Sequence, residues 1–463
     1  MKLIRSLGTL DVILLNVTAI VGLRWISLAA VGGNSSLILW LVALILFFLP
    51  QAFAVIELTT RYPGEGGIYI WTKKAFGESH AFLAGWCYWT SNLVYFPNLL
   101  VYIAGISVFS LGAQYHELGE NRLYVLIFSI SALWLVMFFN IIGLKLGKWL
   151  NNLGGLSTWL TGTILILLAI ISVTRYGLSQ PITTDSLFQG ILSFEKISFW
   201  AAMCFGFSGL ELASVIAGEV KNPRRTIPRA AVISGIIIAT IYILGTLSVI
   251  VSIPKSEISI ISGFLQGIAA ICAKLNMGWM TNMVAILITI GGIGGLMAWF
   301  TAAARMPFMA GVDDYLPAKF KEIHPRYGSP YITIIVQAAI ASVFILMSFI
   351  GATVEEAYLV LLDTTLLVYF VPYVYMFLAY LVLRKRENTI EGVLVVPRNN
   401  SLAKILGISG LLTTLIAMLL SLLPASGIEN VLLYELKVAG GFLMFLISGL
   451  VLFHLKKDKR AKP

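Results

Sequence analysis

The stretch Ala202-Met-Cys-Phe-Gly-Phe-Ser-Gly-Leu-Glu-Leu-Ala213 carries two glycines and a glutamate inside an apolar run of the chain. A second apolar run, Val17-Thr-Ala-Ile-Val-Gly-Leu-Arg-Trp-Ile26, places a glycine close to an arginine. An ionisable side chain at such a depth is costly and normally faces a cavity or a partner. Glycines of this kind more often let helices pack closely. Because two runs share the feature and both carry a charge, we expect two membrane helices that break near their middle and line a site.

The rest of the chain has the composition of a membrane protein. Of its 463 residues, 59% are hydrophobic and 12% are charged, whereas soluble domains carry about 25% charged residues. The apolar residues form runs of roughly 20 residues, the length that crosses a bilayer as a helix. The sequence therefore predicts an all-α membrane protein with twelve transmembrane helices. The predicted spans are residues 8–33, 35–60, 80–113, 121–142, 150–174, 197–220, 227–253, 277–310, 330–350, 356–383, 402–423 and 430–455.

The basic residues predict the orientation of these spans. Of the 32 lysines and arginines, 25 fall on one side of the predicted map, six fall on the other, and Arg24 lies inside a span. Such an excess marks the cytoplasmic side, so we expect a multi-pass protein of the cell (inner) membrane with both termini in the cytoplasm. The net charge of +10 is spread over short loops, which argues against a nucleic-acid partner. The three cysteines have no motif spacing, and we expect no metal site and no cofactor.

Five motifs stand in or next to the predicted spans. They are Pro63-Gly-Glu-Gly-Gly-Ile-Tyr-Ile-Trp71, Phe207-Ser-Gly-Leu-Glu-Leu-Ala213, Ala217-Gly-Glu-Val-Lys-Asn-Pro-Arg-Arg-Thr-Ile-Pro-Arg229, Arg305 followed by Asp313-Asp-Tyr-Leu-Pro317 and Pro330, and Tyr369-Phe-Val-Pro-Tyr373. They resemble motifs of the amino acid–polyamine–organocation (APC) superfamily of transporters, occur in the expected order and extend over roughly 360 residues. The nearest subgroup in appearance is the exchangers similar to arginine/agmatine and glutamate/GABA antiporters.

This resemblance implies the LeuT-type fold, in which spans one to five and six to ten form inverted repeats and helices one and six are broken. Residues 1–383 would then form the ten-helix transport core, and residues 384–463 two peripheral helices and a cytoplasmic tail. Many proton-coupled relatives carry a lysine in span five. Here Thr158 falls near that place, which favours exchange over lysine-mediated proton symport.

The resemblance also implies a set of substrate-binding residues. In relatives the first break reads Gly-Ser-Gly, and its amides bind the substrate carboxylate. This chain has Val21-Gly-Leu-Arg-Trp25 there, and only the middle glycine matches. In span three, Ser91, Asn92 and Phe96 align with the distal pocket of the exchangers. The aromatic residues expected to cover the site are Trp25, Phe205, Trp299 and Phe300, and Phe207 and Gly209 flank the second break.

Arg24 and Asp363 are the two intramembrane charges that depart from the family pattern. They could pair across the cavity as a gate, or Arg24 could anchor a substrate carboxylate while Asp363 anchors an amine. In the third alternative, Arg24 extends to the interface and Asp363 only hydrates its helix. Since lone intramembrane charges are usually functional, we favour the gate or the anchor, and the sequence does not decide between them.

Glu211 is a candidate for proton coupling, because a buried carboxyl can hold a proton. It could equally be a hydrogen-bonded tie between span six and its neighbours. Two further acidic residues, Asp11 and Glu57, lie near cytoplasmic ends, and we expect them to pair with basic residues of the loops rather than to contact substrate.

The predicted function is secondary active transport of amino acids or related small amines by alternating access, as an exchanger or with proton coupling. A polyamine or cationic-amine transporter is the alternative within the class, and a substrate-sensing receptor with a transporter fold is the alternative outside it. We find no metal cluster, nucleophile elbow or paired-acid motif, so an enzyme is not predicted. The expected partners are a small-molecule substrate and the lipid bilayer, with a homodimer left open.

Overall fold

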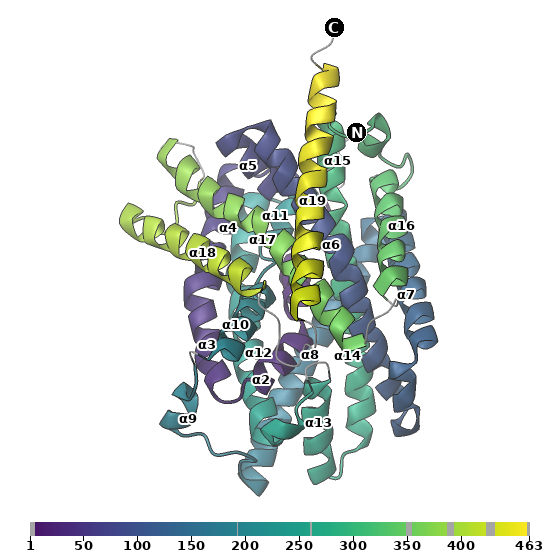
Figure 1. Ribbon diagram of the computed structural model, residues 1–463, viewed down its shortest axis with the longest axis vertical. Helices are drawn as coiled ribbons and strands as arrows, with labels where there is room; N and C mark the ends of the chain where they lie inside the picture. The colour runs from purple at the N-terminus through teal and green to yellow at the C-terminus, as the bar shows by residue number, and fades with distance from the viewer. Residues whose placement is uncertain are drawn as a thin grey trace.

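The computed structural model describes residues 5–191, 193–259, 262–348, 354–386, 393–422 and 431–460. This part of the chain is helical, apart from one isolated bridge between Leu7 and Val220. The α-helices (Figure 1) are α1 (Thr9–Ile20), α2 (Leu23–Val31), α3 (Ser35–Ala43), α4 (Leu49–Arg61), α5 (Ile68–Phe76), α6 (Glu78–Ser107), α7 (Arg122–Ile142), α8 (Leu144–Tyr176), α9 (Thr184–Phe188), α10 (Phe194–Gly206), α11 (Leu212–Val215), α12 (Pro223–Ser252), α13 (Gly263–Lys274), α14 (Trp279–Ala303), α15 (Arg305–Val312), α16 (Tyr331–Ser348), α17 (Val354–Arg386), α18 (Asn400–Leu420) and α19 (Val431–Arg460).

Within these described residues, ten helical stretches are long and apolar enough to cross a membrane. Two of the twelve predicted spans are not among them. The span at 197–220 is divided into α10 and α11, and the described helix in the span at 330–350 ends at Ser348. The ten stretches are Thr9–Val31, Ser35–Arg61, Glu78–Ser110, Arg122–Ile142, Gly147–Tyr176, Pro223–Ser252, Trp279–Val312, Leu359–Lys385, Asn400–Leu420 and Val431–Lys456.

The chain leaves the helical conformation at the two stretches that contain the glycines. Between α1 and α2 only Val21 and Gly22 intervene, and residues 207–211 separate α10 from α11. Gly209 has a φ of +124°, and a Cβ added there would lie 2.8 Å from Cγ1 of Ile20. Only glycine adopts such a backbone without strain, so this residue type fixes the course of the chain at the second interruption and lets it approach the first.

Helix α1 packs against α8, α12 and α14 in the interior of the bundle. The contact between α8 and α14 depends on Gly154 and Gly294, because a Cβ on either residue would lie 2.6 Å from the other's Cα. Small residues allow this close approach between membrane helices. This close contact fixes the positions of α8 and α14, which both pack against α1, the helix that ends at the first interruption.

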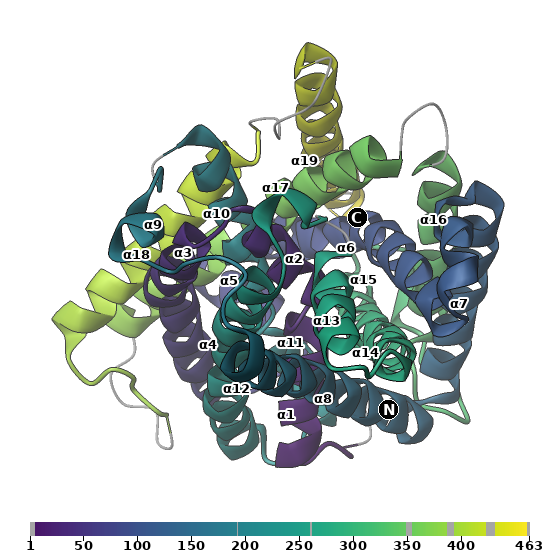
Figure 2. The same cartoon turned by 90° about the horizontal axis from the view of Figure 1, so that it is seen from below.

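The helices α18 and α19 are the least buried of the ten apolar stretches. In the apolar 18-residue window of the Thr9–Val31 stretch, 83% is buried inside the protein, compared with 33% for the window in α18 and 22% for the window in α19. Helices α7 and α16 lie side by side at one edge of the bundle and α18 lies at the opposite edge (Figures 1 and 2). The site must therefore be sought among α1, α2, α6 and their neighbours rather than at the periphery.

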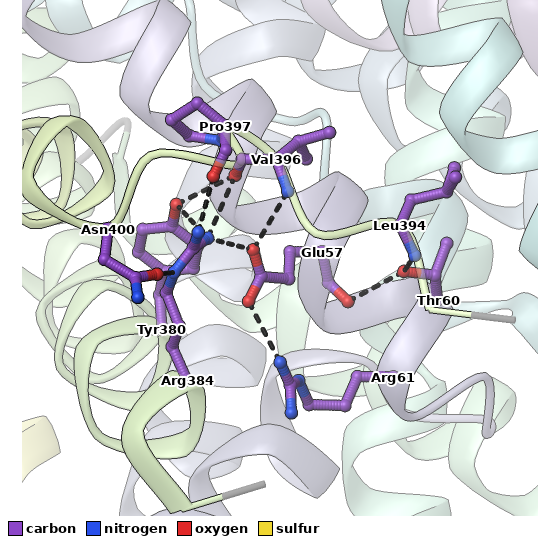
Figure 3. A network of polar contacts seen from close by, with 9 residues as sticks. All are labelled: Glu57, Thr60, Arg61, Tyr380, Arg384, Leu394, Val396, Pro397 and Asn400. Atoms are coloured by element: carbon purple, nitrogen blue, oxygen red, sulfur yellow. Dashed lines mark hydrogen bonds and ion pairs between the residues drawn. The ribbon is translucent and has the colours of Figure 1, made fainter. Parts of the chain in front are cut away.

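Acidic residues near one end of the bundle are paired with basic ones, as the sequence analysis expected for Asp11 and Glu57. Asp11 Oδ2 lies 2.7 Å from Lys148 Nζ. Glu57 forms ion pairs with Arg61, at 3.2 Å, and with Arg384 (Figure 3). The expected pairing with basic residues is confirmed, and these basic residues lie near helix ends.

A further charge cluster lies at the loop before α5. The buried Arg305 guanidinium forms an ion pair with Glu65, at 2.9 Å, and another with Glu219. Glu65 also accepts a hydrogen bond from the Gly218 amide at 2.6 Å. Burial raises the pKa of the Glu65 carboxyl, and the charge of Arg305 opposes the shift. The cluster joins the loop before α5 to the start of α15 and to the segment that follows α11.

Candidate functional site

A central pocket lies between the two interruptions. Its empty volume, including space open to solvent, is about 320 Å³. Five of the predicted site residues line it, namely Trp25, Ser91, Asn92, Phe205 and Trp299. The other lining residues are Ala19, Ile20, Tyr95, Gly206, Ser208, Thr365 and Tyr369.

Polar side chains form hydrogen bonds with backbone groups next to the first interruption. The Trp299 indole donates to the carbonyl oxygen of Ala19 at 2.7 Å. The Tyr242 hydroxyl of α12 accepts from the Gly22 amide at 3.1 Å and lies within hydrogen-bond distance of the carbonyl oxygens of Ile20 and Gly206. Since Gly206 ends α10, one hydroxyl bridges both interruptions. The Gly22 amide is therefore already bonded.

Glu211 is fully buried below the pocket and accepts hydrogen bonds from three tyrosines. The hydroxyl of Tyr369 donates to its Oε1 at 2.6 Å and that of Tyr88 at 3.2 Å. The Tyr373 hydroxyl donates to Oε2 at 2.5 Å, and Gln51 Nε2 lies 3.2 Å from the same oxygen. These partners come from α4, α6 and α17. In this structure the carboxylate is thus the tie between helices that the sequence analysis gave as one alternative, while its role in proton coupling is untested.

Arg24 lies at the first interruption and is almost completely buried, with 1% of its side chain exposed. None of its three guanidinium nitrogens has a hydrogen-bond acceptor within the described part of the chain. Its Cζ lies over the ring of Trp25, 4.6 Å from the centroid, and over that of Tyr95, at 5.0 Å. Cation–π contacts of this kind are favourable but do not replace a counter-ion, so the arginine brings an uncompensated positive charge to the site.

A second cavity, with about 420 Å³ of empty space, adjoins the central pocket and is lined by Arg24. The two share Ala19, Tyr95 and Trp299 as lining residues. Four predicted residues of the first interruption therefore face this second cavity rather than the central pocket. They are Val21, Gly22, Leu23 and Arg24.

The structure does not bring Asp363 to Arg24, which corrects the expected contact between them. Asp363 accepts a hydrogen bond from the Tyr434 hydroxyl of α19 at 2.5 Å. Thr365, two residues further along α17, lines the central pocket. Side chains two apart on a helix point about 200° apart around its axis, so Asp363 faces the peripheral helix α19 instead of the site.

Three predicted aromatic residues line neither cavity. Phe96 and Phe300 pack against each other, with ring centroids 5.2 Å apart, and both are fully buried. Phe207 packs against Trp40, at 4.9 Å, and against the ring of Tyr242. Gly209 is also outside the lining, and its amide donates to the Tyr373 hydroxyl at 2.8 Å. These residues support the site through packing.

Sequence reasoning missed Tyr95, Tyr242 and Tyr369 as site residues. A signal existed for Tyr369, since it stands four residues before Tyr373, and residues with this spacing share a helix face. The sequence offers no comparable sign for Tyr242, a single tyrosine in an apolar run. Among the described residues, no group of three or more His, Cys, Asp or Glu side chains is arranged to hold a metal ion.

The fold and this site define a helical membrane protein with a buried small-molecule pocket, and residues 7–453 match the family model described as amino acid permease. The chain belongs to this family, which confirms the resemblance to APC transporters. It is 30% identical to an uncharacterized transporter of Legionella pneumophila over 96% of this chain and 95% of that protein. It is 23% identical to a probable agmatine/putrescine antiporter of Lactococcus lactis, over 90% of this chain and 88% of the relative. It is also 23% identical to a glutamate/γ-aminobutyrate antiporter of that species, over 90% and 84%. These relatives are transporters rather than enzymes.

Proposed function

We propose that the protein exchanges amino acids or related small amines across the cell membrane by alternating access. The central pocket between the two helix interruptions carries this proposal, because it is buried, aromatic and flanked by two intramembrane charges, Arg24 and Glu211. Relatives whose names specify agmatine, putrescine, glutamate and γ-aminobutyrate support this range of substrates.

The proposal includes the LeuT-type arrangement of twelve spans. Two interrupted helices, α1–α2 and α10–α11, begin what we take as two five-helix repeats within a core of residues 1–383, and residues 384–463 would add two peripheral spans. The low burial of α18 and α19 supports a peripheral place for them.

We also propose that both termini are cytoplasmic. In Figure 1 the last turns of α19 lie at the same end of the bundle as α5 and α15, whereas α9 and α13 lie at the other. The basic residues near α5 and α15 belong to the 25 on the predicted cytoplasmic side. Labelling of an introduced terminal cysteine by an impermeant reagent in intact cells would contradict this orientation. The homodimer remains a prediction, which the mass of the detergent-solubilised protein tests.

Counterflow in proteoliposomes tests the transport proposal. Vesicles are preloaded with one member of a panel of amino acids and amines at a time. For at least one compound of the panel, they should accumulate the same labelled compound, and protein-free vesicles should not. Thr365→Phe, which fills the pocket, should abolish accumulation, while Thr174→Phe on the exposed surface of α8 should not. Absence of counterflow for the whole panel, or equal activity of the two variants, would contradict the proposal.

A further inference from the structure

The Arg24 guanidinium is a buried charge whose presence the other contacts of the site do not explain. The side chain is buried, and its nitrogens have no acceptor in the described part of the chain. A guanidinium stays charged in proteins, and such a group is retained in a membrane protein where it acts on a ligand or a partner.

The nearby acidic groups do not supply the counter-charge in this structure. Asp363 bonds Tyr434 and faces α19. Glu211 already accepts from Tyr88, Tyr369, Tyr373 and Gln51. Neither carboxylate forms an ion pair with Arg24, so this charge has no counter-ion within the described part of the chain, and an anionic ligand would supply one.

Two amides of the interruption itself are not available to an anion. The Val21 amide donates to the carbonyl oxygen of Val17 at 2.9 Å, and the Gly22 amide donates to the carbonyl oxygen of Ile20 and to the Tyr242 hydroxyl. The guanidinium of Arg24 is the charged donor at this place, and its N–H groups have no acceptor in the described part of the chain.

The surroundings also orient the guanidinium. Its Cζ lies over the rings of Trp25 and Tyr95, and contacts with ring faces leave the N–H edge of an arginine available for a carboxylate, which it binds with two parallel hydrogen bonds. Because the Arg24 cavity and the central pocket share three lining residues, one ligand can place an anionic group at Arg24 and its remaining atoms among the aromatic rings of the central pocket.

We propose that Arg24 binds a carboxylate of the transported substrate, so that the transporter accepts carboxylated compounds and rejects the matching amines that lack this group. The inference rests on the proposed transport function and narrows its substrate class. Chloride from solution could supply the same negative charge, and the experiment separates these two sources.

The test compares amino acids with their decarboxylated amines, for example arginine with agmatine and ornithine with putrescine. Thermal unfolding of the purified protein and counterflow are measured for wild type, Arg24→Lys and Arg24→Met. Arg175→Met, an exposed arginine at the end of α8, serves as the control. A further series without organic ligand compares chloride with a bulky sulfonate.

For at least one pair, we expect the amino acid to raise the Tm of the wild type and of Arg175→Met and the amine to have little effect. Arg24→Met should weaken binding of the amino acid by about tenfold or more, as expected for loss of a charge-assisted bond, and Arg24→Lys should retain part of it. The unliganded Tm of Arg24→Met should not fall, because methionine removes a buried unpaired charge. A fall in this Tm would instead indicate that Arg24 has a structural role and would contradict the proposal.

Three other results would overturn the inference. Counterflow of amines as efficient as that of amino acids would leave the transport function intact and refute the carboxylate site. An Arg24-dependent rise in Tm with chloride alone would assign the site to an inorganic anion. Absence of both binding and counterflow for the whole panel would refute the inference together with the proposed function.

Discussion

The Tyr369 hydroxyl donates a hydrogen bond to Oε1 of Glu211 at 2.6 Å, and the same tyrosine lines the central pocket. A side chain placed to contact a ligand is thus directly bonded to the buried carboxylate of the second interruption. Movement of Tyr369 on ligand binding would change the hydrogen bonds of Glu211 and, through them, the contacts among α4, α6 and α17.

Tyr369→Phe should therefore affect both stability and transport. Loss of one hydrogen bond to a charged acceptor costs about 1–3 kcal/mol, and we expect an increase in KM because the lost hydroxyl belongs to a pocket residue. Tyr88→Phe is the matched control, since Tyr88 donates to the same oxygen but does not line the pocket. Equal changes in KM for the two variants would show that Tyr369 has no separate role at the ligand.

Glu211→Gln should destabilise the protein by about 1–3 kcal/mol, because the amide group would present a donor to neighbours that are themselves donors. If Glu211 exchanges a proton during transport, the variant should also lose the pH dependence of uptake. Stability is measured by unfolding in detergent, and uptake across a pH series. Glu257→Gln, at an exposed carboxylate, is the control. An unchanged pH profile would leave Glu211 with a structural role alone.

The positions of the helices along the chain could be predicted because hydropathy is a property of the linear sequence. Apolar runs of sufficient length located the ten described stretches that can cross a membrane, but not shorter helices such as α5, and the glycines marked the places at 21–22 and 207–211 where the chain leaves the helical conformation. The same reasoning predicted that Asp11 and Glu57 pair with basic residues, although it did not identify which ones, since carboxylates at helix ends are close to basic loops. How deep a residue lies in the membrane, and whether it lies near the end of a helix, follow from its position within an apolar run.

Rotation about a helix axis could not be predicted in this way. Lipid and protein interior are both apolar, so the hydropathy of α17 does not tell which face meets the site. Asp363 was assigned to the cavity because it is an intramembrane charge, although it faces α19, and Thr365 was overlooked. Phe96 was assigned from the family resemblance and Phe300 as a covering aromatic residue, and sequence alone does not distinguish an aromatic residue in a pocket from one in the core.

Arg384 joins the end of α17 to the segment that leads into α18 (Figure 3). It forms an ion pair with Glu57 and donates to Asn400 Oδ1 at 3.1 Å and to the carbonyl oxygen of Pro397 at 2.5 Å. A lysine has one ammonium group and cannot reach these acceptors together. We expect Arg384→Lys to lower stability by about 1–3 kcal/mol, and Arg384→Met to lower it more because the buried Glu57 then loses this ion pair and keeps the one with Arg61.

Unfolding in detergent measures this effect, and Arg398→Lys offers a comparison because Arg398 belongs to the same segment and is not part of the network in Figure 3. Counterflow at a temperature well below unfolding should be nearly normal in Arg384→Lys, since the cluster is remote from the pocket residues. A large loss of transport without loss of stability would mean that the cluster takes part in the transport cycle.

Tyr242→Phe tests whether the two interruptions are held together through one hydroxyl. The variant keeps the ring that stacks on Trp40, with centroids 4.5 Å apart, but removes one of the two acceptors of the Gly22 amide and the bond to the Gly206 carbonyl oxygen. Backbone groups left without partners in a buried site cost about 1–3 kcal/mol, so we expect a loss of that size in stability. Transport should fall as well, because the relative position of α1 and α10 defines the pocket.

Tyr176→Phe is the control, since its hydroxyl donates to the Lys274 carbonyl oxygen at 2.9 Å on the exposed surface. If Tyr242→Phe and Tyr176→Phe unfold at the same temperature and transport equally well, water or the backbone itself must satisfy the interruption, and the bridge has no role in either property.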